Sequence, residues 1–80
     1  MYVMFNKNEI SINNESEAKY YTYGNSQKQY FYDHTTYTWN AFDKRGNSCV
    51  IMMKTSPTSP TTNLEVLYLK YNYGYEYIME

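Results

Sequence analysis

Tyrosine most constrains what this chain can fold into, because twelve of its 80 residues are tyrosine and 20% are aromatic. Aliphatic residues are scarce by comparison, with three leucines, four isoleucines and three valines. A hydrophobic core must therefore use rings, each of which can bury on the order of 150–250 Å². Since every tyrosine hydroxyl needs a hydrogen-bond partner or water, we expect several of the twelve to lie partly exposed. Exposed rings are typical of binding interfaces, although tyrosine also suits half-buried strands with no such role.

Length and charge narrow the class of protein. We expect residues 1–80 to form a single small domain, which buries only roughly 60% of the surface that its unfolded chain exposes. A formal net charge of −1 argues against a polybasic nucleic-acid arm and against an acidic polyanion mimic. The longest uninterrupted apolar run is residues 49–53, and the N-terminus lacks the features of a signal peptide. We therefore expect a cytoplasmic protein without a membrane span.

Short β-forming segments alternate with turn-forming residues along the chain, which predicts a mainly β fold. We expect a small curled antiparallel sheet or barrel of five to seven short strands in mostly up-and-down order. The clearest hairpin joins residues 36–42 to residues 48–54 through the turn 43–47, with Gly46 in a left-handed conformation. Another turn is predicted at residues 24–26, where Gly24 and Asn25 tolerate positive φ.

Two segments are ambiguous between helix and strand. Residues 14–20 allow one short helix, with Asn14 as its cap and Glu15 and Glu17 in its first turn. The β-forming residues 20–23 that follow slightly favour a strand, so an α+β sheet with one packed helix is the alternative fold. Residues 64–71 fit both periodicities, and the strand is narrowly favoured because the segment Asn72-Tyr73-Gly74 reads as a hairpin loop with Gly74 in the left-handed region.

Residues with catalytic or metal-binding chemistry are few. His34 and Asp33 can pair only if a turn brings their side chains together, and we predict a turn there. Cys49 with His34 is a formal nucleophile–base couple, but a small buried hydrophobe is the usual role of such a cysteine. A single cysteine also excludes an internal disulfide and a multi-cysteine zinc site. We therefore expect no enzyme activity, no cofactor and no metal.

The first functional hypothesis is a non-enzymatic protein-binding module. Tyr71, Tyr73, Tyr75 and Tyr77 follow at every second position, which places them on one face of a strand. That face is either a contact surface or the core face with its hydroxyls at the rim. An unpaired terminal strand would also favour a homodimer through edge pairing, or strand addition to a partner. The predicted partner-binding residues lie in two segments of the chain: Tyr71, Tyr73, Tyr75 and Tyr77, together with Tyr37 and Trp39.

The alternative hypothesis is a small β-barrel that binds single-stranded nucleic acid by stacking bases on rings. Tyr30 and Tyr32 would belong to the stacking platform, and Lys44 and Arg45 would lie near phosphates. The net charge of −1 disfavours nucleic acid as a partner, because such sites normally carry a positive groove.

The composition also indicates a source. Asparagine, lysine, tyrosine and isoleucine are frequent while arginine and alanine are rare, a bias typical of AT-rich genomes. In size and composition the chain is similar to small phage-encoded proteins that inhibit a host defence system or a host enzyme by occluding a surface. The expected partner is therefore a host protein or protein complex, met in the cytoplasm of the host cell.

Overall fold

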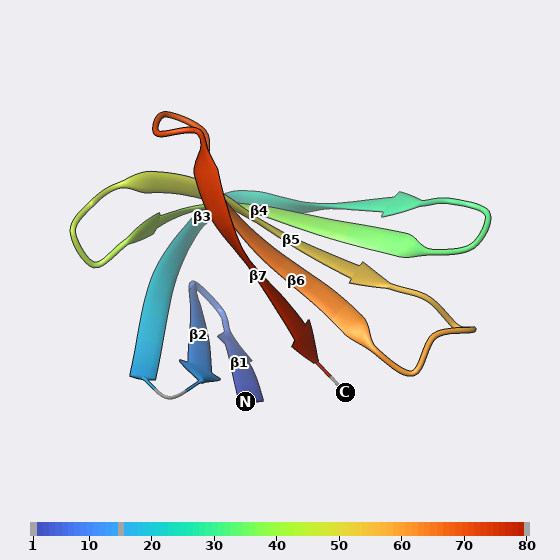
Figure 1. Ribbon diagram of the computed structural model, residues 1–80. Coiled ribbons are helices and arrows are strands. Elements are labelled where there is room, and N and C mark those ends of the chain that lie inside the picture. The colour runs from blue at the N-terminus through green and yellow to red at the C-terminus, as the bar shows by residue number, and fades with distance from the viewer. Residues whose placement is uncertain (1, 15, 80) are drawn as a thin grey trace.

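The computed structural model describes residues 2–14 and 16–79, and these residues form one antiparallel sheet of seven strands (Figure 1). Each strand pairs with its neighbours in the sequence, so the sheet order is the chain order. The sheet curls into a half-barrel, which confirms the predicted mainly β fold. The strands are β1 (Tyr2–Asn6), β2 (Glu9–Asn14), β3 (Ser16–Tyr30), β4 (Thr35–Asp43), β5 (Ser48–Thr55), β6 (Thr62–Tyr68) and β7 (Tyr73–Met79).

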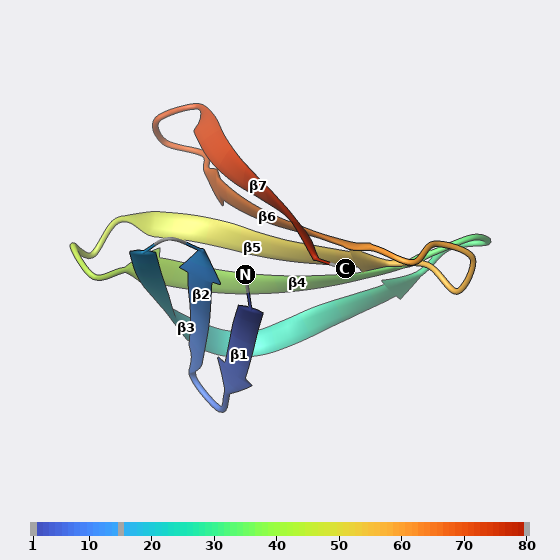
Figure 2. The ribbon, with the colours of Figure 1, turned by 60° about the horizontal axis from the view of Figure 1, so that its bottom comes forward.

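The core lies on the concave face of the sheet, around which the strands wrap (Figure 2). Alternation within the strands produces it: in β6, Leu64 and Val66 are fully buried, while Glu65 and Leu67, which alternate with them, point to the convex face. The aliphatic residues are few, but the largest fully buried side chains are all aliphatic. The buried core residues are Ile10, Ile12, Tyr20, Ala41, Cys49, Ile51, Leu64, Val66 and Tyr68.

The short helix considered for residues 14–20 is wrong, and so is the α+β alternative. Asn14 ends β2, Glu15 lies outside the described residues, and β3 begins at Ser16. The β-forming residues 20–23 prevail because both sides of this segment are paired: Tyr20 lies opposite Ile10 of β2 and Asp43 of β4. An isolated helix of one or two turns offers no comparable set of contacts.

The turn predicted at residues 24–26 is also wrong, because β3 continues through it for a total of 15 residues. Gly24 does adopt positive φ, at 69°, but it does so inside a strand. The register against β4 shifts between Tyr23 and Gln27, which marks a β-bulge. A bulge bends its strand and increases the local twist, so these turn-forming residues help the sheet to curl.

The hairpin between β4 and β5 is confirmed. Residues 35–42 pair with residues 48–55, and Gly46 at the turn has a φ of 85°. Asp43 closes this turn, since one carboxylate oxygen accepts hydrogen bonds from the backbone N–H groups of Arg45 and Asn47, both at 2.9 Å. The Tyr37, Trp39 and Ala41 side chains share the concave face, as the alternation predicts.

The C-terminal hairpin forms, but its turn differs from the prediction. β6 ends at Tyr68, the loop is residues 69–72, and Asn72 rather than Gly74 has positive φ, at 56°. Gly74 lies within β7 opposite Leu67, where a Cβ atom would stand 2.5 Å from the Val66 carbonyl oxygen. Asparagine tolerates the left-handed conformation, so the loop does not need glycine at that position. Glycine is needed instead at position 74, where the neighbouring backbone lies too close for a side chain. The strand reading of residues 64–71 is confirmed as far as Tyr68.

Candidate functional site

Three of the four tyrosines predicted to share a strand face, Tyr73, Tyr75 and Tyr77, lie in β7 and continue the concave face that holds the core. Tyr71 lies in the loop that precedes β7, so its assignment to the strand is wrong. Tyr73 pairs with Tyr68, Tyr75 with Val66 and Tyr77 with Leu64, so these rings adjoin the buried residues of β6. Tyr77 packs against the core, whereas Tyr71, Tyr73 and Tyr75 are each about half exposed. Tyr77 is therefore part of the core, whereas the three rings nearer the hairpin loop are open to solvent.

We call Tyr68, Tyr71, Tyr73 and Tyr75 the tyrosine cluster, because their rings contact one another. Tyr73 stacks on Tyr68 with ring centroids 5.2 Å apart, and Tyr75 meets Tyr73 edge-on at 5.9 Å. Tyr71 lies against Tyr73 at 6.2 Å. These separations fall within the range in which aromatic pairs attract one another.

Two hydrogen bonds tie this cluster to the β4–β5 turn. The buried Tyr68 hydroxyl donates to the Asp43 carboxylate at 3.0 Å, and the Tyr71 hydroxyl donates to the Asn47 side-chain oxygen at 3.4 Å. Asn47 in turn donates to Asp43 through its side-chain amide at 3.3 Å. The β4–β5 turn and the β6–β7 hairpin thus hold one another in place.

Asp43 is the electrostatic centre of this connection. Desolvation is the largest single influence and raises its pKa, but the hydrogen bonds from Asn47, Tyr68 and Arg45 together outweigh it, so the pKa lies below its usual value. Burial, reinforced by the hydrogen bond to Asp43, raises the pKa of the Tyr68 hydroxyl. The carboxylate is therefore ionised and the hydroxyl protonated at neutral pH, which is the combination that this hydrogen bond requires.

A pocket of about 260 Å³ lies beside this connection. The rings of Tyr75 and Tyr77 line it together with Lys44 and Arg45 from the β4–β5 turn. The structure therefore brings together two tyrosines assigned to protein binding and the two cations assigned to nucleic acid. The full lining is Ala18, Lys19, Tyr20, Asp43, Lys44, Arg45, Tyr68, Tyr75 and Tyr77.

Tyr37 and Trp39 lie apart from the tyrosine cluster. The strand register places Trp39 of β4 in one row with Ile51, Val66 and Tyr75. Strands β5 and β6 therefore lie between Trp39 and the tyrosine cluster. Three strand spacings amount to about 14 Å. Trp39 instead stacks near Tyr37 and contacts Phe5 of β1, with ring centroids 5.5 Å apart, at a largely apolar pocket of about 340 Å³.

The nucleic-acid platform proposed from the sequence is divided. Tyr30 and Tyr32 lie at the β3–β4 hairpin, where Tyr32 is fully exposed, while Lys44 and Arg45 lie at the opposite end of β4. Nine residues of strand correspond to about 30 Å. The cation near Tyr30 is Lys28, whose ammonium lies 4.9 Å from that ring and 5.2 Å from the Tyr37 ring.

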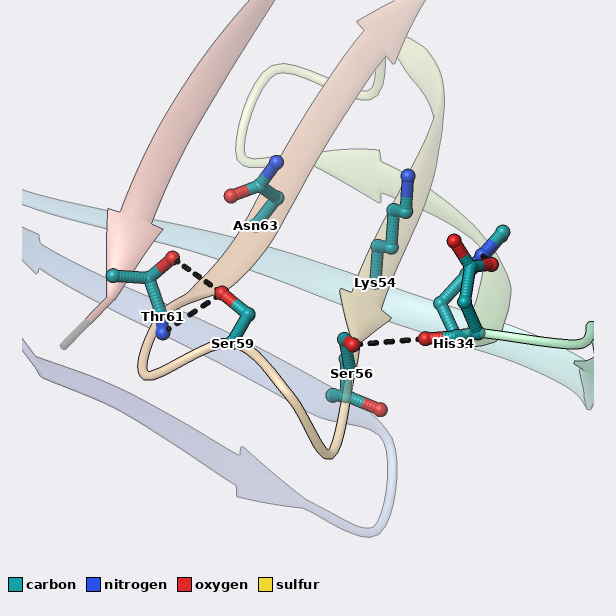
Figure 3. A pocket seen from close by; sticks show the side chains of 8 residues that line it. His34, Lys54, Ser56, Ser59, Thr61 and Asn63 are labelled. Carbon is teal, nitrogen blue, oxygen red and sulfur yellow. Dashed lines mark hydrogen bonds and ion pairs between the residues drawn. The ribbon is translucent and has the colours of Figure 1, made fainter.

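A polar pocket of about 270 Å³ lies between the β3–β4 turn and the β5–β6 loop (Figure 3). The pairing of Asp33 with His34, which the sequence left open, is present, with 2.7 Å between the carboxylate and Nδ1. Ser56 donates its hydroxyl hydrogen to the Asp33 backbone carbonyl rather than to the imidazole. This network joins the turn to the loop, and its hydroxyls are engaged with one another.

The formal couple of Cys49 with His34 does not form. Cys49 pairs with Ala41 near one end of β4, whereas His34 immediately precedes the other end. Cys49 is buried, and burial raises the pKa of its thiol to about 11. It is therefore a protonated core residue at neutral pH.

Sequence reasoning missed the residues that organise this site. The sequence placed Asp43 only in the turn 43–47 and Tyr68 only in the segment 64–71, yet their hydrogen bond joins residues 25 positions apart. The available signal was the Asp43–Asn47 spacing, which is typical of a side-chain-closed turn.

Comparisons with family models, with curated proteins and with solved structures found no match to this chain. Within the described residues, no helix has the length and apolar character needed to cross a bilayer.

Proposed function

We propose that this chain is a non-enzymatic protein-binding module whose contact surface is the tyrosine cluster with the adjacent Leu69. One observation carries the proposal: three neighbouring rings are about half exposed, and two of them, Tyr73 and Tyr75, pack on the buried Tyr68, which is hydrogen-bonded to Asp43. Contiguous exposed apolar groups of this kind are typical of interaction sites. Leu69 adds to them from the hairpin loop, where its side chain is 72% exposed.

The arrangement suits binding because the rings are already ordered. A tyrosine has few rotatable bonds, so its immobilisation at an interface costs little entropy. Contacts between the rings and the hydrogen bond from Tyr71 to Asn47 reduce that cost further. The surface therefore supports a rigid aromatic anchor for a partner's apolar pocket or groove.

We further propose that the partner is a host protein or protein complex, and that binding occludes a surface which the partner needs. This proposal rests on size and composition, in which the chain is similar to small phage or mobile-element inhibitors. It places the activity in the cytoplasm of the host cell, without turnover of a substrate.

The test compares two sets of exposed tyrosines. A triple variant with Tyr71→Ala, Tyr73→Ala and Tyr75→Ala removes the proposed contact surface, whereas the matched control Tyr30→Ala with Tyr32→Ala removes exposed rings from the other end of the sheet. In a pull-down from a lysate of the host, we expect the wild type and the control to recover one host protein in stoichiometric amount. The triple variant should not recover it. Circular dichroism must show that both variants fold. Equal recovery by all three proteins would overturn the assignment of the surface.

A second candidate function is the binding of single-stranded nucleic acid. It is favoured by the pocket in which Lys44 and Arg45 face Tyr75 and Tyr77, because a base stacks on a ring while its phosphate meets a cation. Fluorescence anisotropy with a labelled single-stranded oligonucleotide at two salt concentrations tests this candidate. Salt-sensitive binding that is lost on Lys44→Ala with Arg45→Ala would favour it over protein binding.

A further inference from the structure

The two edges of the sheet cannot close against each other in the manner of the other strands. All six pairings are antiparallel, so β1 and β7 run in the same direction. A β1–β7 pair within one molecule would be parallel, and the sheet order contains no such pair. In the part of the chain that the structure describes, both strands therefore present one side without a neighbouring strand (Figure 2).

β1 lacks the features that normally protect an exposed edge. Its five residues, Tyr2 to Asn6, include no charge, no proline and no bulge. Tyr2 is 60% exposed, Met4 47% and Phe5 45%. Natural sheets commonly protect an edge strand with lysine, proline or a bulge, because a bare edge pairs with another strand.

We propose that β1 pairs with β1 of a second copy of this chain, antiparallel and about a two-fold axis near Met4. Two-fold symmetry reverses the direction of the second strand, so this contact extends the antiparallel sheet, which a β1–β7 pair cannot do. In this register Met4 faces Met4 of the second copy, and Val3 faces its Phe5. Every cross-strand pair is then between uncharged side chains.

The β7 edge is a poorer self-complement because of its charge. Glu76 lies near its middle and already stands directly opposite Glu65 of β6. A two-fold axis at residue 75, 76 or 77 would place the Glu76 side chains of both copies on one face, directly opposite or diagonally adjacent. Like charges in these positions repel, so the observations favour β1 as the dimer edge.

Matched substitutions at the two edges test the proposal. Met4→Lys and Ile78→Lys each place a charge at an exposed convex-face position of an edge strand. With untagged protein in analytical ultracentrifugation, we expect the wild type and Ile78→Lys to be dimers and Met4→Lys to be monomeric, with unchanged circular dichroism. A monomeric wild type, or a dimer that Met4→Lys does not dissociate or that Ile78→Lys also dissociates, would overturn the proposal.

Cross-linking tests the register. Directly opposed residues in an antiparallel pair are close enough for a disulfide, so Met4→Cys should form a covalent dimer on mild oxidation. Ile78→Cys is the control, and the buried Cys49 should keep the wild type free of cross-links. A covalent dimer of Ile78→Cys without one of Met4→Cys would assign the interface to β7 instead. Neither result depends on whether the tyrosine cluster binds a partner.

Discussion

At the scale of single residues, the glycines of this sheet serve different purposes. Gly46 has open space around the position of a Cβ atom but a φ of 85°, so its requirement is conformational. Gly74 has no such φ, but a Cβ atom there would lie 2.5 Å from the Val66 carbonyl oxygen and 2.8 Å from Leu67 Cδ2. Its requirement is space.

We therefore expect Gly74→Ala to destabilise the protein by about 1–3 kcal/mol, the usual range for overpacking. Gly46→Ala should cost about 1–2 kcal/mol because the left-handed conformation is unfavourable for alanine. Asparagine separates the two causes, since it tolerates positive φ but is larger than alanine. Urea unfolding should show Gly46→Asn to be milder than Gly46→Ala, and Gly74→Asn to be no milder than Gly74→Ala. A rescue at position 74 would contradict the steric explanation.

Asp43 gives the stability of the protein a defined pH dependence. Its pKa is lower in the folded state than in the unfolded chain, so its ionised form stabilises the fold. This contribution is complete above the usual aspartate pKa of about 3.9 and is lost as pH falls through the lower folded value. We expect Asp43→Asn to be less stable than the wild type at neutral pH, and this difference in unfolding free energy to shrink in acid. Fluorescence of the single tryptophan, Trp39, can follow unfolding. A difference that stays constant with pH would contradict this role.

At the scale of elements, the β6–β7 hairpin contains an electrostatic conflict. Glu65 and Glu76 are directly opposed on its convex face, and no ion pair between the described residues involves either of them. The remaining contacts of the hairpin, above all the stacking of Tyr73 on Tyr68, must outweigh this repulsion.

Glu65→Lys should convert the repulsive pair into an attractive one and stabilise the protein by about 0.2–1 kcal/mol. The gain should decrease at high salt, because the pair lies on a solvent-facing side of the sheet. Adding Glu76→Lys supplies the control, since two opposed lysines restore the repulsion. Thermal unfolding of the two variants and the wild type measures the effect. Equal stabilisation by the single and double variants would show that the charge pair is not the cause.

At the scale of the whole molecule, a small core of mainly aliphatic side chains stabilises the sheet, and partly exposed aromatic side chains lie around it. Ile51 is fully buried in β5, where it pairs with Trp39 on one side and Val66 on the other. Ile78 lies on the convex face of β7 and is 58% exposed. Isoleucine therefore occurs in this sheet both as a fully buried residue and as a mostly exposed one.

Ile51→Ala should cost about 2–5 kcal/mol through lost burial and a cavity, and Ile78→Ala should cost less than about 0.5 kcal/mol. For a domain of this size the larger loss approaches the entire free energy of unfolding. We expect Ile51→Ala to be largely unfolded at room temperature by circular dichroism, and Ile78→Ala to remain folded. A well-folded Ile51→Ala variant would mean that the aromatic residues stabilise the sheet without the aliphatic core.

Local patterns of the sequence determined much of this protein. Alternation and turn residues were sufficient to predict a curled antiparallel sheet and the β4–β5 hairpin with Gly46 in its turn. They also placed Tyr73, Tyr75 and Tyr77 on one face. These features depend on neighbours in the sequence, which a periodicity records directly.

Tertiary structure decided the rest, because competing local preferences are resolved by partners that are distant along the chain. Residues 16–23 are strand rather than helix because residues 16–21 pair with β2 and residues 20–23 pair with β4. Gly74 lies in β7, where the Val66 carbonyl oxygen and Leu67 leave no space for a Cβ atom, and the left-handed position of the loop is Asn72 instead. The hydrogen bond from Tyr68 to Asp43, which anchors the tyrosine cluster, spans 25 positions of sequence and exists only once β4, β5 and β6 have paired. A period-two pattern contains no information about such contacts, because it specifies the face of a strand but not what lies across from it.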